Sequence, residues 1–419
     1  MGSSSELGKR SVRGKRKPKS ICLPFPSESV YNKCMEDRVY CREYLTPLFA
    51  RHPELFPQAM AAGYTLHGFL HSKKQKLTMR RIKLKLDGEQ YQLRPSFVMP
   101  YIIGRTEEVE KALFLRRWGV PFEALAYVFG QDAMFWYRAY VALGRPSIVG
   151  TTIKDPALLP DHLVADEKHT RRKGKRVYVA TTVAKDCILG SEVVADAGVD
   201  ALTKGYQTFH QEAGNLDPNY TPKTVNTDGW KPTQKAWSSL FPRVQIILCF
   251  FHSVLKIKNR CKRDIHLFAP LQEKLWHIYH ADTLASFAQR IRRFREWVAR
   301  QQMTESVKEK VVDFCANANT FKKAYHYPGA YRTSNALERL MNYQDRLLYA
   351  MQYFHGTNES SSRYARAMAL LWNFHPYDRK TQRKYGLAAS PFQKLNGFQY
   401  HHNWLQNMMI AASIGGWKT

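Results

Sequence analysis

The hydrophobic pattern changes along the chain, and each change predicts a different kind of element. Residues 79–93 alternate between basic and apolar side chains on either side of an Asp-Gly pair, which predicts a β-hairpin. Residues 106–143 carry apolar side chains at helical spacing, interrupted by two glycines, which predicts three short helices joined by tight turns. Residues 163–251 contain short β-branched runs separated by turns and by two helical stretches. The last pattern is typical of an α/β unit with several strands.

Within that unit the elements follow the order β-β-β-α-β-α-β. This order is the topology of the RNase H-like fold, in which a mixed five-stranded sheet lies between helices. The first and fourth strands are then neighbours, so that Asp166 and Asp228 face one another. Residues 255–327 show helical spacing without a strand signal, which predicts an all-helical insertion before the last core helix.

Composition divides the rest of the chain. The expected regions are a disordered basic arm (1–20), an N-terminal region with the hairpin (21–104), a helix-turn-helix-like DNA-binding domain (105–145), a linker (146–160), the first part of the core (161–254), the helical insertion (255–327), the last core helix (328–355) and a basic, aromatic helical region (356–419). The three helices also fit a plain helical bundle. The C-terminal region either stacks bases or is an ordinary helical subdomain.

The chain is strongly basic. Lys and Arg number 64 against 35 acids, a formal charge of +29, which favours a nucleic-acid partner over an anionic membrane. Seven scattered cysteines without a CxxC pair predict reduced thiols and no structural zinc. Without a signal sequence or an apolar run long enough to span a bilayer, a soluble cytoplasmic protein is expected. The expected DNA contacts are Arg80, Arg81, Lys83 and Lys85 on the hairpin, Arg138 and Arg145 on the third helix, and Lys256, Lys258 and Arg260 on a basic helix. For the hairpin, a merely solvated face is the alternative.

Three acids from separate elements are the candidate catalytic residues. Asp166 and Asp228 follow apolar runs, and Glu338 lies on a helix stripe with Asn335 and Asn342, apart from the apolar stripe. The alternative for Glu338 is a capping box with Asn335 as the N-cap. Three gathered carboxylates suit hard cations, so we expect two Mg²⁺ or Mn²⁺ ions and phosphoryl transfer.

Four motifs in this order resemble the DDE transposases of bacterial insertion sequences, in the broad group that includes Mutator-like elements. They are VADE with Asp166, TDGW with Asp228, the CxxH pair Cys249 and His252, and TSNALERLMN with Glu338. The resemblance covers residues 163–350. It implies metal-dependent cleavage of transposon ends and strand transfer into target DNA, with the three acids as metal ligands. Cys249 and His252 are implied to support the site, and the protein is implied to act on double-stranded DNA as a dimer or higher oligomer at the bacterial nucleoid.

The sequence also allows other interpretations of these residues. Glu167 adjoins Asp166, although alternation along a strand sends it to the opposite face. Cys249 also fits a buried strand thiol and His252 a helix-capping imidazole. At the level of function, the alternatives are a transposase-derived DNA-binding protein without catalysis and an RNase H-like nuclease or resolvase.

Overall fold

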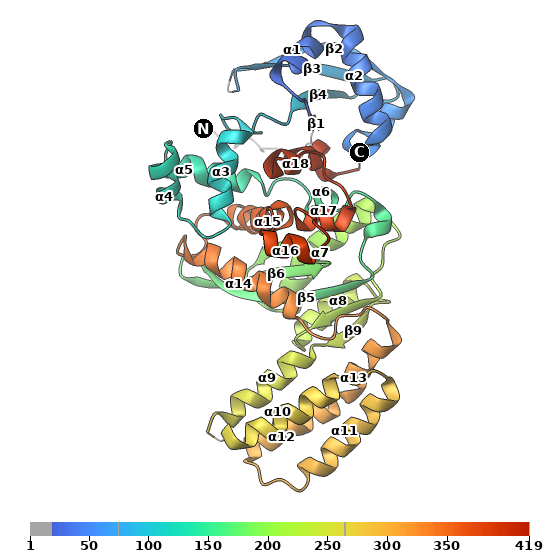
Figure 1. Ribbon diagram of the computed structural model, residues 1–419, viewed down its shortest axis with the longest axis vertical. Coiled ribbons are helices and arrows are strands. Elements are labelled where there is room, and N and C mark those ends of the chain that lie inside the picture. Colours follow the sequence, from blue (N-terminus) through green and yellow to red (C-terminus); the bar gives the residue numbers. More distant parts are fainter. Residues whose placement is uncertain (1–18, 74, 264, 419) are drawn as a thin grey trace, which may run out of the picture.

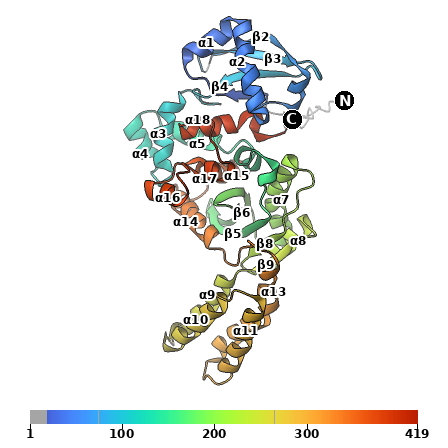
Figure 2. The ribbon, with the colours of Figure 1, turned by 45° about the vertical axis from the view of Figure 1, so that its right-hand side comes forward.

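The computed structural model describes residues 19–73, 75–263 and 265–418. It is a mixed α/β protein with one sheet of four strands and one of five. The molecule is elongated: the smaller sheet lies at one end, the larger sheet in the middle and a group of helices at the other end (Figures 1 and 2). Residues 1–18 of the expected basic arm lie outside the described residues. Within these ranges, no helix has the length and apolar character that crossing a membrane requires.

The N-terminal sheet has the strand order β1-β4-β3-β2. The elements are β1 (Ser20–Leu23), α1 (Glu28–Glu36), α2 (Arg38–Arg51), β2 (Tyr64–Ser72), β3 (Leu77–Leu84) and β4 (Gln90–Pro95). The predicted hairpin is confirmed, because β3 and β4 pair antiparallel around the Asp-Gly turn. Strands β1 and β2 were not predicted. β1 joins the sheet by pairing parallel to β4, a long-range contact without a local signal.

The expectation that Arg80 lies on an exposed cationic face is wrong. Arg80 is only 2% exposed, and its guanidinium donates to the carbonyl oxygens of Cys34 and Met35 at the end of α1. Strand alternation explains the error, because Arg80 shares a face with buried Ile82, and a helix C-terminus favours a cation. Lys83 remains exposed.

The three predicted helices between residues 106 and 143 are confirmed. They are α3 (Thr106–Arg116), α4 (Phe122–Phe129) and α5 (Ala133–Ala142). They pack on the long helix α15 (Asn358–Phe374): Arg116 is fully buried and donates to the Tyr364 hydroxyl at 2.6 Å. Arg138 and Arg145 are exposed, as a DNA contact requires, and their role stays a prediction.

Residues 146–160 are not a free linker. They contain helix α6 (Ile148–Thr152), and Ile148 and Val149 are fully buried. The 3%-exposed Glu212 accepts hydrogen bonds from the Ser147 hydroxyl at 2.9 Å and the Val149 amide at 3.0 Å, and it pairs with Arg366 at 2.6 Å. The prolines and glycines of this stretch shape a packed connection, a property that composition alone does not reveal.

The central sheet has the order β7-β6-β5-β8-β9. Its elements are β5 (His162–Arg172), β6 (Lys175–Ala184), β7 (Cys187–Val194), α7 (Val199–Leu216), β8 (Thr224–Thr227), α8 (Lys231–Leu240) and β9 (Gln245–Leu248). The predicted element order and the adjacency of the first and fourth strands are confirmed. β5 and β8 run parallel and β5 and β6 antiparallel, so the sheet is mixed.

The first strand is longer than expected. The apolar run that ends in Asp166 predicts a strand that stops at this acid, and the basic residues from His169 to Arg176 predict a turn after it. Instead β5 continues to Arg172, paired with β6 as far as Lys175. Asp166 therefore lies in the middle of β5, at the level where the neighbouring strand β8 stops.

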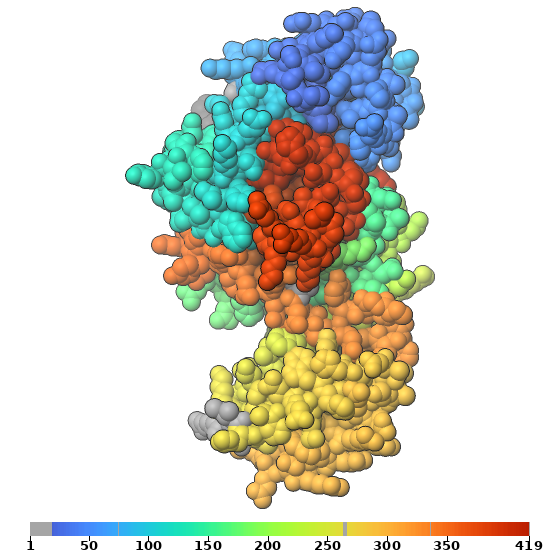
Figure 3. All heavy atoms as spheres, viewed as in Figure 1, coloured from blue at the N-terminus to red at the C-terminus, as the bar shows by residue number. Residues whose placement is uncertain are grey.

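The remaining elements are helical. After β9 come α9 (Phe250–Arg260), α10 (Ile265–Tyr279), α11 (Leu284–Val298), α12 (Glu305–Ala316) and α13 (Ala318–Lys322), and then α14 (Asn335–Tyr349), α15, α16 (Arg379–Lys384), α17 (Pro391–Asn396) and α18 (Trp404–Ala411). Helices α9 to α13 form the predicted helical insertion around their own apolar core, at one end of the molecule (Figures 1 and 3). The C-terminal helices cover the middle of the face seen in Figure 3.

His375, the C-cap of α15, predicts a pH dependence of stability. Burial, followed by the charge of Arg117, lowers its pKa to about 3, and its ring stacks on Phe114. In the unfolded chain the pKa is about 6.5, so the unfolded state takes up the proton first as the pH falls. The stability contributed by neutral His375 is complete above about pH 6.5 and is lost progressively toward pH 3.

Urea unfolding at pH 7 and pH 5 measures this effect. From pH 7 to pH 5 the free energy of unfolding of the wild type should fall by about 2 kcal/mol more than that of a His375→Leu variant, because the effect is about 1.4 kcal/mol per pH unit below 6.5. An equal pH dependence of the two proteins would contradict the assignment to His375.

Candidate active site

Asp166 and Asp228 lie side by side on neighbouring strands. Val164 of β5 is paired with Asn226 of β8. Asp166 and Asp228 each come two residues after this pair, so the two acids lie at the same level of the sheet. Asp228 comes directly after the last residue of β8, and its carboxylate accepts a hydrogen bond from the Trp230 amide at 2.8 Å. The turn requires Gly229: its φ is +95°, and a Cβ there would lie 2.6 Å from the Leu248 side chain.

The electrostatics agree with this proximity. The pKa of Asp166 is raised to about 7, first by burial and then by the negative charges of Asp228 and Glu167. The nearby His252 opposes these effects. Two partly buried carboxylates held together in this way favour a bound cation, because like charges repel when they are removed from water.

Glu167 points to the other side of the sheet, as strand alternation predicted. It accepts hydrogen bonds from the Tyr206 hydroxyl of α7 at 2.6 Å and from the Thr233 hydroxyl of α8 at 2.5 Å. Lys168, in contrast, shares the face of Asp166 and donates to Asp345 of α14 at 2.5 Å. The first acid on the α14 face is therefore Asp166, and Glu167 has a structural role between two helices.

Cys249 and His252 connect helix α14 to the central sheet. Ser334, the N-cap of α14, lies 3.2 Å from the Cys249 sulfur and 3.3 Å from the His252 Nδ1, and its amide donates to the same sulfur at 3.3 Å. Burial opposes ionisation of both motif residues. The hydrogen bond and charge between them outweigh burial, lowering the pKa of Cys249 and raising that of His252. The charges of Asp166 and Asp228 also favour the protonated imidazole.

The two alternatives for this motif, a buried strand thiol for Cys249 and a helix-capping imidazole for His252, do not explain the contacts of these residues. Cys249 is fully buried, as an ordinary core thiol would be, but it takes part in a polar cluster. Cys249 itself occupies the N-cap position of α9, without a capping side-chain hydrogen bond. His252 instead bridges toward Ser334 and the acid pair.

Glu338 lies one helical turn, about 6 Å, beyond Ser334. The capping box, which was the alternative for Glu338, is absent, because the N-cap is Ser334, not Asn335, and makes no capping side-chain bond. Glu338 shares a stripe with exposed Asn335 and Asn342 and with Asp345, while Leu337 on the other stripe is buried. Since Asp345 bonds Lys168 on the Asp166 face of β5, this stripe faces the acid pair.

The three acids do not, however, form a complete metal site. Within the part of the chain that the structure describes, no group of three His, Cys, Asp or Glu side chains is arranged to hold a metal ion. Asp166 and Asp228 fit a divalent cation, because their oxygen donors suit a hard ion and the negative charge of Asp228 adds to burial in raising the pKa of Asp166. Glu338 lies on the stripe of α14 that faces the acid pair, but its carboxylate is not close enough to Asp166 and Asp228 to share a metal ion with them.

A lysine-lined groove of about 1240 Å³ begins beside Asp228, at Gly229, and separates α8 and β9 from α12 and α13. Among the described residues, its basic side chains are Lys231, Lys235, Lys256, Lys310 and Lys323, against a single acid, Asp313. Lys310 is neutralised by Asp313 at 3.0 Å and by Glu309 at 2.7 Å. The other four have no carboxylate at ion-pairing distance among the described residues. Lys256 donates to the main-chain oxygen of Asp228 at 3.4 Å, which links the groove to the acid pair.

Sequence reasoning found only part of this surface. Of the expected DNA contacts, Lys256 lines the groove, while Lys258 and Arg260 are exposed elsewhere on α9. On the hairpin, Arg81 is half-buried and donates to Gln90, and Lys83 and Lys85 are exposed. Ser334 and the lysines at 231, 235 and 323 were missed. Their positions in the sequence could have indicated three of these residues. Lys231 and Lys235 follow the TDGW motif, and Ser334 lies inside TSNALERLMN.

Comparison with known proteins adds no assignment. No family model matches the chain, and no curated protein matches its sequence.

Proposed function

We propose that the protein is a DNA transposase with an RNase H-like core, which cleaves DNA strands and joins them to target DNA in a reaction that depends on divalent metal ions. The observation that carries the proposal is the carboxylate pair of Asp166 and Asp228 on adjacent parallel strands, next to the end of α14 that carries Glu338. The strand order of the central sheet and the helical insertion before α14 support it.

Asp166 and Asp228 would hold a divalent cation, and Glu338 would complete the ligand set. Bound Mg²⁺ would neutralise charge on the phosphodiester and make an attacking oxygen more nucleophilic. The chain's own residues prepare the site. Asp228 is held by the Trp230 amide, and the Ser334 cluster fixes the start of α14 against β9.

The groove supports a DNA substrate. Four lysines without carboxylate partners are suited to successive phosphates, and Trp230, half-exposed beside Lys231, offers a ring on which a base can stack. We infer that the cleaved strand leaves the acid pair along this groove, between the sheet and the helical insertion.

Replacing Lys235 and Lys323 by Gln tests the groove. Each lost phosphate contact removes about 0.9 from the slope of log affinity against log salt, so the double variant should bind DNA with a slope less steep by about 2. Fluorescence anisotropy of labelled DNA across salt concentrations measures the slope. The matched control is Lys173→Gln with Lys175→Gln, at the turn between β5 and β6. An equal change in both double variants would show that the groove has no special role.

The second candidate is a DNA-binding protein without catalysis. The separation of Glu338 from the acid pair favours it, since two carboxylates alone leave the ligand set incomplete. Nicking and strand joining by the purified protein with Mg²⁺, on DNA that carries the sequences flanking its coding region, decides between the two candidates. Cleavage without joining would indicate a nuclease or resolvase.

A further inference from the structure

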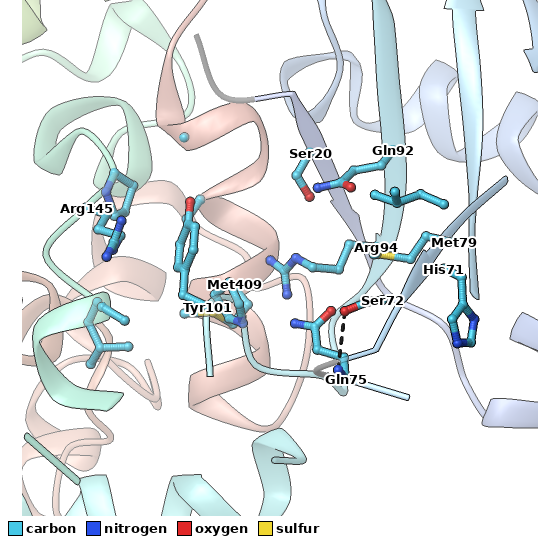
Figure 4. A pocket seen from close by; sticks show the side chains of 17 residues that line it. Ser20, His71, Ser72, Gln75, Met79, Gln92, Arg94, Tyr101, Arg145 and Met409 are labelled. Carbon is cyan, nitrogen blue, oxygen red and sulfur yellow. Dashed lines mark hydrogen bonds between the residues drawn. The ribbon is translucent and has the colours of Figure 1, made fainter. Parts of the chain in front are cut away.

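A second cavity lies far from the acid pair along the fold, between the N-terminal sheet and the helices that follow it. It has a volume of about 440 Å³, within the range of about 300–1,000 Å³ typical of small-molecule sites. Its walls come from the four strands of the N-terminal sheet on one side. On the other side they come from residues 100–101, the end of α5 with the segment after it, and α18 (Figure 4). No lining residue belongs to β5, β8 or α14, so this cavity is separate from the candidate active site.

The cavity is positively charged. Arg94 and Arg145 contribute to the lining, and no Asp or Glu among the described residues does. Arg94 is only 7% exposed; one of its N–H groups donates to the Val98 carbonyl at 2.7 Å, and no carboxylate in the described ranges lies at ion-pairing distance from it. In Figure 4 its guanidinium points from β4 into the space facing Tyr101. A buried cation without a counter-charge is costly, so this position favours an anionic ligand.

A buried hydroxyl on the same wall lacks a partner. Ser20 Oγ is inaccessible to water and makes no hydrogen bond within the described structure. Ser20 is the register partner of Gln92, and Figure 4 shows the two side chains next to one another on the Arg94 wall. Ser20 and Gln92 therefore add polar side chains to the Arg94 wall.

The opposite wall is aromatic. The guanidinium of Arg145 stacks over the Tyr101 ring at 4.3 Å, and Met409 lies beside this pair (Figure 4). Tyr101 has a φ of +70°, an uncommon conformation that costs free energy for a residue other than glycine. An aromatic ring with a guanidinium plane is a surface on which a nucleobase can stack.

We propose that this cavity binds one nucleotide, with its phosphate on Arg94 and its base against Tyr101 and Arg145. Two sources supply that chemistry: a free mononucleotide, or an unpaired nucleotide of a bound DNA strand. The proposal goes beyond strand cleavage and does not depend on the acid pair.

The test uses the full-length protein carrying Asp228→Asn, so that cleavage does not affect the result. Calorimetric titration with dAMP measures the affinity for a free mononucleotide. Competition between a duplex with one unpaired adenosine and the same duplex fully paired measures the preference for an unpaired nucleotide of a DNA strand. The variants are Arg94→Met and Tyr101→Ser. Because Arg94 is buried, the more exposed Tyr101→Ser keeps the test valid if Arg94→Met unfolds. Arg293→Met, an exposed arginine on α11 outside the cavity, is the control.

At least a tenfold loss of dAMP affinity in the cavity variants, with none in the control, would support a free nucleotide. A preference for the unpaired duplex that disappears in the same variants would support a DNA nucleotide. The proposal is overturned if neither ligand distinguishes Tyr101→Ser from the parent protein. Each of these outcomes is independent of whether the wild type cleaves DNA.

Discussion

Asp228→Ala should abolish strand cleavage while leaving the fold intact. The carboxylate lies at the end of β8, half-buried beside Asp166, where it would share a divalent cation. Loss of one ligand removes several kcal/mol of charge stabilisation, which corresponds to a decrease of about 10³-fold or more in rate. Mg²⁺-dependent nicking of DNA that carries the flanking sequences measures the rate, and circular dichroism checks the fold.

The matched control is Asp200→Ala, an exposed acid in the first turn of α7, which should cleave at the wild-type rate. A folded Asp228→Ala protein with undiminished cleavage would remove Asp228 from the site. Glu338→Ala then examines the third ligand. We expect a loss as large as that of Asp228→Ala; if Glu338→Ala retains activity, a different group completes the site.

Glu212→Ala should produce the largest loss of stability. Glu212 is 3% exposed and holds three partners: the Ser147 hydroxyl, the Val149 amide and the Arg366 guanidinium. Removing one member of a buried ion pair leaves the other charge uncompensated, which costs about 3–5 kcal/mol. The free energy of unfolding in urea, followed by tryptophan fluorescence, measures this cost.

A second ion pair on α15 provides the comparison. Glu359 pairs with Arg363 at 2.5 Å, but both side chains are exposed. Glu359→Ala should therefore cost less than about 1 kcal/mol. If the two variants lose similar stability, the buried pair does not fasten α6 and α15 to α7 in the way that its burial implies.

The sequence by itself determined the β3–β4 hairpin, the order of the central elements and the identity of the acid pair. An Asp-Gly pair between alternating runs is sufficient for the β3–β4 hairpin, because a tight turn and strand pairing are local properties. The spacing of β-branched runs gave the order of the central strands. That order makes β5 and β8 neighbours, and it brings Asp166 to Asp228.

Only the tertiary structure decided which polar groups are buried, and beside what. Arg80 and Arg81 are adjacent and chemically identical, but the helix that packs on one face of β3 buries the first against its carbonyl oxygens. Ser334 became part of the site because α14 begins against Cys249, which is 85 residues earlier in the chain. The lysine groove likewise combines α8 with α12 and α13. Such contacts join segments far apart in sequence, and local periodicity contains no information about the partner that each face will meet.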